Sequence, residues 1–292
     1  MSETAQVITD ELRQWILAQV RAGHGADAVV QAMKASGWQE GVALAAMEEV
    51  VAGQMRDAAG PVAHSVTQPL AHHAAVSVPA LKPEAGHEIW AVDRHVRVVL
   101  HLDHPGVVVF ADLLSTQECA ELRALAGARL ARSETVVHAT GGSEVNAART
   151  SEGMFFTRGE NELVARIEAR LAALLNWPLE NGEGLQVLRY APGAEYKPHF
   201  DYFDPAQPGT AAVLRRGGQR VGTVVMYLNT PEQGGATVFP DAGLTVHPIE
   251  GHAVFFSYSQ PAAATKTLHG GAPVIQGEKW VATKWMRQGR FD

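Results

Sequence analysis

The chain has 292 residues, of which 46% are hydrophobic and 19% are charged, a composition that is typical of a folded globular protein and excludes gross disorder. Its net charge of -7 excludes a surface built mainly to neutralise phosphates, although a local basic groove is compatible with it. The single cysteine, Cys119, excludes an intramolecular disulfide.

Residues 1–55 are predicted to form a small helical module. Their first residues are acidic and lack an apolar segment, so we expect no secretory signal. No stretch approaches the roughly 18 apolar residues of a membrane span, so we expect a cytoplasmic protein without membrane contact. Val29, Val30 and Met33 share one face of the second of three short helices. The module faintly resembles a UBA-like bundle, but a small accessory or oligomerisation element is favoured, and a protein partner is left open.

Residues 56–87 are predicted to be a linker. Alanine, proline and histidine dominate this segment without any periodicity, and prolines recur along it. Its histidines, among them His64, His72 and His73, lack the spacing of a defined metal site. We therefore expect no metal to be bound there.

Residues 88–292 are predicted to form a second, larger domain of mixed helices and strands. Strands are expected at 96–102 and 106–110, and helices at 115–132, which opens with a capping box and buries Cys119, and at 160–175. Short strands separated by glycine and proline turns follow, at 185–190, 220–229, 244–247, 252–257 and 280–286. Helices followed by many short strands indicate an α+β fold, a β-sandwich or jelly roll buttressed by helices.

A His-x-Asp pair lies in the segment that follows the strand at 185–190. Residues two apart in a strand point to the same side, so His199 and Asp201 would present a nitrogen and a carboxylate oxygen to one point. Two histidines and one carboxylate are the ligands of non-haem Fe(II) oxygenases. A lone His-x-Asp is common by chance, and the third ligand must come from elsewhere in the chain.

A second candidate segment lies downstream and contains His269 and Lys279. Lys279 is flanked by Trp280 and Val281 in a predicted buried strand, where an unpaired charge is costly. Either its side chain reaches solvent, or its ammonium holds the carboxylate of a ligand.

These motifs together resemble the prolyl 4-hydroxylase-like branch of the 2-oxoglutarate and Fe(II)-dependent dioxygenases. The resemblance covers about residues 104 to 288. It rests on the His-x-Asp, the Leu-His-x-Gly-x-Pro-Val context of His269, the Lys-Trp pair that follows, and several shorter matches. These shorter matches are Arg149-Thr-Ser151, Arg189-Tyr190, 223–229 and Gly234-Gly-Ala-Thr-Val-Phe-Pro240. The resemblance implies that the jelly roll is a double-stranded β-helix.

The resemblance also implies roles for single residues. His199, Asp201 and His269 match the iron ligands, and Lys279 matches the residue that binds the distal carboxylate of 2-oxoglutarate. Tyr190 and Thr223 match positions that support this carboxylate, and Arg149 and Trp285 match positions near the substrate mouth; packing is the alternative for these. Ala236, Ala272 and Thr283 depart from the residues usual in the family, which bears on the identity of the substrate and leaves the metal ligands unaffected.

The implied reaction is hydroxylation of a prolyl or related residue in a peptide or protein. Its cofactors are Fe(II) and 2-oxoglutarate, with ascorbate as an optional addition, and its by-products are succinate and carbon dioxide. Because Asp201 occupies the position that related halogenating enzymes leave open, hydroxylation is favoured over halogenation. The same chemistry on a free amino acid or small molecule is the first alternative. A nucleic-acid demethylase is disfavoured by the acidic charge and by a lysine at the carboxylate position, and a non-catalytic binding protein by the complete ligand set.

The segment from 202 to 220 is rich in glycine, proline and alanine and carries Arg215, Arg216 and Arg220. It directly follows the His-x-Asp pair, so it is placed to overhang the site. We predict a long loop without regular structure that acts as a mobile substrate lid, with a passive surface loop as the alternative.

Overall fold

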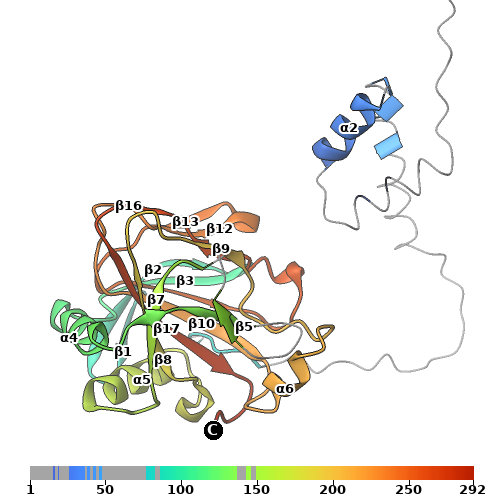
Figure 1. The fold of residues 1–292 in the computed structure, drawn as a ribbon. Helices are drawn as coiled ribbons and strands as arrows, with labels where there is room; N and C mark the ends of the chain where they lie inside the picture. The colour runs from blue at the N-terminus through green and yellow to red at the C-terminus, as the bar shows by residue number, and fades with distance from the viewer. Residues whose placement is uncertain are drawn as a thin grey trace, which may run out of the picture. The chain divides into compact units, whose positions relative to one another are not determined.

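The computed structural model describes residues 26–36, 77–82, 86–136, 143–145 and 149–292, together with single residues or pairs between 16 and 47 (Figure 1). The chain divides into two compact units, Met1–Ala71 and His72–Asp292. None of the helices in these described parts is long and apolar enough to cross a membrane.

The N-terminal unit contains the helix α2 (Ala26–Ala35). Val29, Val30 and Met33 are buried in one small apolar cluster, against which Trp38 packs. The shared face predicted for these three residues is therefore confirmed. Most of the predicted first and third helices lies outside the described residues.

The C-terminal unit is built on a large antiparallel sheet whose strands are ordered β1-β2-β3-β14-β10-β17-β8-β7-β4 (Figure 1). The first three of these strands are β1 (Glu88–Ala91), β2 (Arg94–Leu102) and β3 (Gly106–Ala111). The strands that complete the sheet are β14 (Ala253–Ser257), β10 (Arg220–Tyr227), β17 (Lys279–Arg287), β8 (Leu185–Tyr190), β7 (Glu152–Phe156) and β4 (Ala131–Arg132).

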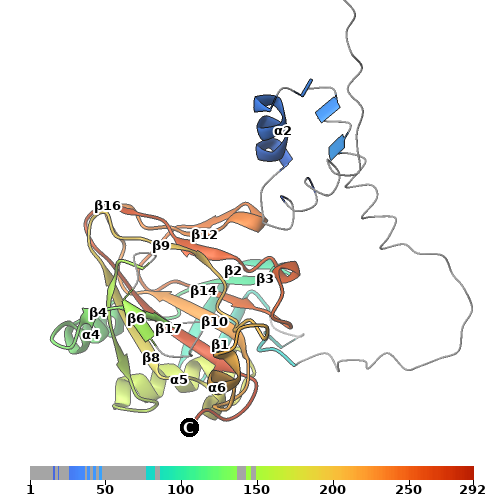
Figure 2. The same cartoon turned by 45° about the vertical axis from the view of Figure 1, so that its right-hand side comes forward.

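A smaller sheet faces the large one, with strand order β13-β12-β15-β9 (Figure 2). Its strands are β13 (Leu244–Val246), β12 (Thr237–Phe239), β15 (His269–Gly271) and β9 (Tyr196–His199). Two further short pairs join β11 (Gln233–Gly234) to β16 (Val274–Gln276) and β5 (Glu134–Val136) to β6 (Ser143–Val145). Two facing antiparallel sheets form a jelly roll, so the predicted fold class is confirmed.

Two helices, α4 (Thr116–Gly127) and α5 (Glu162–Leu174), pack on the other face of the large sheet (Figures 1 and 2). The capping box of α4 is present, since the Ser115 hydroxyl accepts from the Glu118 amide at 3.1 Å and the Ser115 amide donates to the Glu118 carboxylate at 2.9 Å. Cys119 belongs to this helix, and its side chain is buried in the core, as expected. The helix ends earlier than predicted, because β4 begins at Ala131 and pairs with β7.

Successive side chains of β17 point alternately into the two hydrophobic cores of this unit. Ala282 and Met286 face the helix layer, whereas Val281 belongs to the core between the two sheets. Lys279 and Trp285 therefore lie on the inter-sheet side as well, since residues two apart in a strand share a face. The space between the sheets is where polar side chains converge.

The segment from 202 to 220 has more regular structure than the sequence predicted. It contains the short helix α6 (Thr210–Leu214), and hydrogen bonds connect it to the last residues of the chain. The amide of Gly289 donates to the carbonyl of Gly217 at 2.8 Å, and Arg287 donates to the carbonyl of Gly218 at 2.7 Å. The expectation of no regular structure in this segment was therefore wrong, and its role as a mobile lid stays a prediction.

A buried arginine connects both helices to the first hairpin. Arg170 on α5 is 1% exposed, and its guanidinium binds the carboxylates of Glu118 at 2.8 Å and Asp93 at 2.7 Å. We expect Arg170→Met to lower the free energy of unfolding by about 3–5 kcal/mol, because it removes the closest cationic partner of the buried Glu118 carboxylate and leaves it only the longer contacts to Arg166 and Arg94. Urea unfolding of the variant measures this. The matched change Arg97→Met removes an exposed pair with Asp112 and should cost at most about 1 kcal/mol.

Candidate active site

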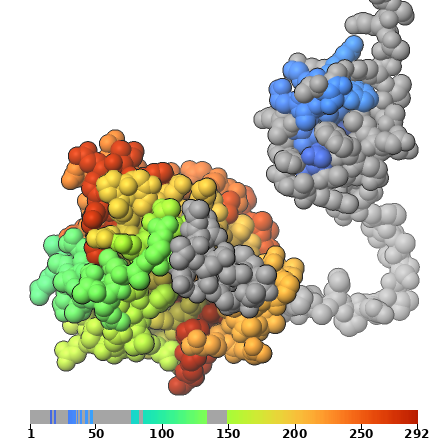
Figure 3. All heavy atoms as spheres, in the orientation of Figure 1, coloured from blue at the N-terminus to red at the C-terminus, as the bar shows by residue number. Residues whose placement is uncertain are grey.

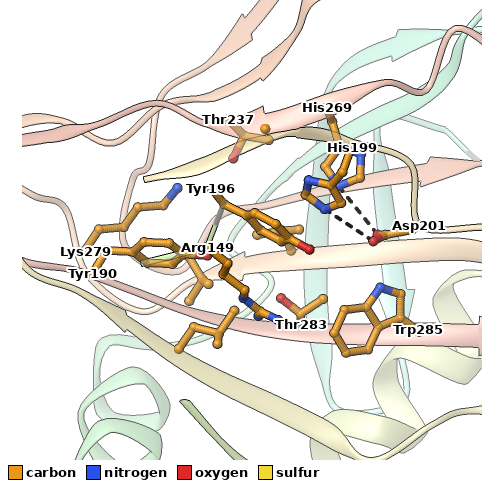
Figure 4. Close-up of a pocket in the computed structure, with 14 residues that line it drawn as sticks. Arg149, Tyr190, Tyr196, His199, Asp201, Thr237, His269, Lys279, Thr283 and Trp285 are labelled. Carbon is orange, nitrogen blue, oxygen red and sulfur yellow. Dashed lines mark ion pairs between the residues drawn. The ribbon is translucent and has the colours of Figure 1, made fainter. Parts of the chain in front are cut away.

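Three potential metal ligands meet between the two sheets. His199 ends β9, Asp201 follows it, and His269 begins the neighbouring strand β15, where it lies directly opposite His199. The Nε2 atoms of both histidines lie 3.5 Å from oxygens of the Asp201 carboxylate (Figure 4). One ligand atom from each residue lies within 4.8 Å of the others. The structure thus brings together the three residues predicted to hold the metal.

Backbone carbonyls fix which imidazole nitrogen is free to bind an ion. The Nδ1 of His199 lies 2.8 Å from the carbonyl oxygen of Lys197, and that of His269 lies 3.0 Å from the carbonyl of Thr267. A carbonyl can only accept, so each Nδ1 carries the proton and donates it. Each Nε2 is left with its lone pair directed at Asp201, the arrangement that orients metal-binding histidines.

The charge states in this cluster also suit a cation. Burial lowers the pKa of His269 to about 4 despite the nearby Asp201, so its imidazole is neutral at pH 7. Burial by itself would raise the pKa of Asp201, but His269, His199 and Arg220 outweigh it and hold that pKa well below its usual range. The neutral imidazole of His269, the imidazole of His199 and one carboxylate on a single side fit a non-haem iron site.

Thr223 contacts the carboxylate of the metal ligand Asp201. Its hydroxyl donates to the Asp201 carboxylate at 2.8 Å and lies 3.0 Å from the hydroxyl of Tyr258. Thr223 is fully buried and does not belong to the residues that line the cavity next to the metal site. Its position suits it to orient Asp201, whereas the sequence had suggested that it supports the carboxylate of 2-oxoglutarate.

The cavity extends from the metal ligands to Lys279, which lies at its opposite end (Figure 4). Lys279 is 4% exposed, so its ammonium does not reach solvent. The Nζ atom lies 5.5 Å from the ring centre of Tyr190 and 5.8 Å from that of Tyr227. Among the described residues, no carboxylate forms an ion pair with it. A buried cation at the end of an open cavity is suited to bind the carboxylate of a ligand.

The remaining predicted residues also line this cavity. Tyr190 lies directly opposite Lys279 in the pairing of β8 with β17. Arg149 is buried, donates to the Gln186 side chain at 2.9 Å, and lies over the ring of Tyr196. Trp285 closes the cavity on the same side as Asp201 (Figure 4).

Comparison with known proteins is consistent with this geometry. The family model described as the 2OG-Fe(II) oxygenase superfamily matches residues 185–287, which include all three ligands and Lys279. Prolyl 4-hydroxylase 5 of Arabidopsis thaliana is 40% identical over 209 residues, covering 64% of this chain and 70% of that protein. Prolyl 4-hydroxylase 1 of the same plant is 42% identical over 205 residues, covering 63% and 69%. The chain belongs to the prolyl 4-hydroxylase family of 2OG-Fe(II) oxygenases.

Among solved structures, the viral collagen prolyl hydroxylase of Paramecium Bursaria Chlorella virus-1 is 30% identical to this chain. The match covers 62% of this chain and 95% of the viral one, with a TM-score of 0.48. The recognition made from the motifs is confirmed by the family model and by the relatives from Arabidopsis thaliana. As a member of this oxygenase family, the protein is a dioxygenase that uses Fe(II) and 2-oxoglutarate.

Tyr196 is a site residue of this oxygenase that sequence reasoning missed. Its ring stacks on the imidazole of His199 with ring centres 3.7 Å apart. Burial raises the pKa of its hydroxyl to about 12, so Tyr196 is protonated at pH 7. Tyr196 and His199 are three residues apart, and strict alternation would place them on opposite faces. A register shift in the pairing of β9 with β15 places both toward the cavity, a feature that the sequence signals only through Pro198.

The affinity of the oxygenase for 2-oxoglutarate is expected to fall at high pH. Burial lowers the pKa of Lys279 to about 8, so the ammonium that attracts the carboxylate is lost as the pH rises through this value. The dissociation constant should be flat below pH 8 and should rise by up to about tenfold per pH unit above it. Titration of 2-oxoglutarate at pH 7 and pH 9 measures this. A dissociation constant that is the same at both values would contradict the assignment of Lys279.

Proposed function

We propose that this oxygenase hydroxylates a prolyl residue within a peptide or protein. In the overall reaction one oxygen atom enters a C–H bond of the substrate, and the other converts 2-oxoglutarate to succinate and carbon dioxide. The observation that carries the proposal is the 40% identity to a prolyl 4-hydroxylase across the unit that contains the ligand cluster and Lys279.

The chemistry of the cavity supports a peptide substrate. Trp285 is 7% exposed, and in the described part of the chain its indole N–H has no hydrogen-bond partner. A peptide carbonyl would satisfy this buried donor. The aromatic rings of Tyr196 and Trp285 give the cavity flat apolar walls suited to a proline ring.

A groove continues outward from His199, as a longer substrate requires. It is lined by side chains from the segment after β9 and from the turn before β15: Phe200, Tyr202, Asp204, Gln207, Pro261, Ala262 and Ala263. Phe200 and Tyr202 are stacked with ring centres 4.8 Å apart. Aromatic grooves of this kind suit proline-rich chains in an extended conformation.

Each part of the site has a separate task in this reaction. Bound Fe(II) would supply the activation of dioxygen. His199, Asp201 and His269 would hold the ion at the end of the cavity opposite Lys279. Lys279 binds and orients the far carboxylate of 2-oxoglutarate by a charge-assisted hydrogen bond. The cavity walls position the substrate carbon and exclude water.

The proposal is tested by incubating the purified protein with Fe(II), 2-oxoglutarate and a set of proline-containing peptides. The expected product is one added oxygen atom on a proline, seen by mass spectrometry, with one succinate formed per hydroxyl group. Peptides with alanine in place of proline are the control and should remain unmodified. Addition of oxygen to free proline or to an oligonucleotide, and to no peptide, would overturn the proposal. A requirement for ascorbate stays a prediction, which omission of ascorbate from the same assay tests.

A further inference from the structure

Six side chains alternate between cations and aromatic rings from the cavity to the surface of the catalytic unit. The guanidinium of Arg220 lies 4.1 Å from the ring centre of Trp285 and 4.9 Å from that of Phe203. Arg287 continues the series, at 4.9 Å from Phe203 and 5.1 Å from Phe291. Arg216 ends it, 4.3 Å from Phe291. We call these six residues the cation–aromatic stack.

A single buried carboxylate holds the middle of the stack. Glu183 accepts from Arg220 at 2.6 Å and 2.9 Å and from Arg287 at 2.7 Å. The bidentate contact fixes the plane of the Arg220 guanidinium, and this plane sets how the ring of Trp285 can lie on it. Glu183 and Arg287 are both buried, so this part of the stack is held in one arrangement.

The outer end of the stack is held by backbone contacts. The amide of Phe291 donates to the carbonyl of Glu180 at 2.9 Å, and its carbonyl accepts from Arg158 at 2.6 Å. Arg216 donates to the carbonyl of Asp292 at 2.6 Å. The last residues of the chain therefore lie against the segment around α6, and Figure 3 shows both at the lower edge of the C-terminal unit, in red and orange.

The inner end of the stack reaches the reacting groups. Trp285 lines the cavity, and its buried indole N–H is the donor assigned above to the substrate. The Nη1 of Arg220 lies 3.5 Å from the backbone carbonyl of the metal ligand Asp201. Phe203 stands two residues after Asp201, so the stack also holds the start of the 202–220 segment.

We propose that Phe291, at the far end of the stack, is a positioning residue for substrate binding. Its ring packs on the guanidinium groups of Arg287 and Arg216 and limits how they can move. Arg287 in turn packs on Phe203, Phe203 on Arg220, and Arg220 on the indole of Trp285, so the orientation of the indole depends on the whole series of contacts. Loss of the ring would leave Trp285 in the cavity but free to tilt, so its N–H would be aimed less well at the substrate. The stack contacts the metal ligand Asp201 at its backbone carbonyl, whereas the Asp201 carboxylate is oriented by the hydroxyl of Thr223. This inference rests on the proposed function, because the assay uses a proline-containing peptide as the substrate.

The test compares Phe291→Leu, which keeps apolar bulk and removes the aromatic face, with Phe291→Tyr, which keeps that face. We expect Phe291→Leu to raise the KM for a proline-containing peptide about three- to tenfold. The KM for 2-oxoglutarate and the iron content should stay the same. Phe291→Tyr should restore the peptide KM. Arg290→Ala, at an exposed position that pairs only with Asp292 among the described residues, is the control.

A second measurement does not need the substrate. The chain has six tryptophans, whose indole N–H signals can be separated by NMR, with Trp285→Phe to assign the relevant one. Phe291→Leu should shift the signal of Trp285 more than those of tryptophans outside the stack, and Arg290→Ala should leave it in place. An unmoved Trp285 signal, or equal peptide KM values for Phe291→Leu and the unaltered protein, would overturn the inference. If no peptide is hydroxylated even by the unaltered protein, the proposed function fails and the NMR result still decides the role of Phe291.

Discussion

Replacing Asp201 by alanine is expected to abolish iron binding and succinate formation. The change removes the only carboxylate ligand and leaves two imidazoles, so we expect a loss of metal affinity on the order of a hundredfold or more, above the 10–100-fold typical of supporting residues. Iron content per chain and succinate formation measure the two effects. The metal-free fold should persist, because the substitution removes a buried charge together with its hydrogen bond from Thr223, and Arg220 keeps its pair with Glu183.

His252→Ala is the matched control for this prediction. His252 directly precedes β14 and lies outside the ligand cluster, so its removal should change neither iron content nor turnover. His269→Ala should behave like Asp201→Ala. Full activity of the His269→Ala protein would contradict the ligand set, even if Asp201→Ala were inactive.

Replacing Lys279 by methionine is expected to raise the requirement for 2-oxoglutarate far more than it lowers the maximal rate. The side chain keeps much of its length and loses its charge in a buried cavity. Removal of one partner from a buried charge pair costs about 2–5 kcal/mol, so the dissociation constant should rise at least about thirtyfold. Measuring succinate formation over a wide range of 2-oxoglutarate concentrations separates KM from kcat.

Lys82→Met is the control for this second prediction, because Lys82 is exposed on the segment that packs beside α5. Its KM for 2-oxoglutarate should equal that of the unaltered protein. Iron content should be normal in both variants, since Lys279 lies at the far end of the cavity from the ligands. A Lys279→Met protein with an unchanged KM would show that the carboxylate binds elsewhere.

The larger elements could be predicted from the sequence because their patterns are long and local. The strand at 185–190 has the predicted bounds, and the capping box at Ser115 marks the start of α4. The short strand β15 was missed, since Gly270 weakens a strand pattern, and the strand expected to carry both His199 and Asp201 ends at His199. Pairing with neighbours in the small sheet overrides these local preferences.

Within the candidate site, only the residues that belong to a recognisable sequence motif could be predicted. Alternation places His199 beside Asp201, but nothing in the spacing identifies His269, which several strands separate from them; the family resemblance supplied it. The roles of Thr223 and Tyr196 depend on tertiary contacts and on a register shift, neither of which a sequence displays. The cation–aromatic stack joins residues from distant parts of the chain and has no sequence signature either.

The pairing of His199 with His269 has a consequence for stability. The two imidazoles belong to adjacent strands, and β9 is the outer strand of the small sheet, so a bound ion fastens that edge to its neighbour. A metal at a hundred times its dissociation constant stabilises the folded state by about 2.7 kcal/mol. The melting temperature of the protein is therefore expected to rise with iron occupancy, and it can be measured before the substrate is identified.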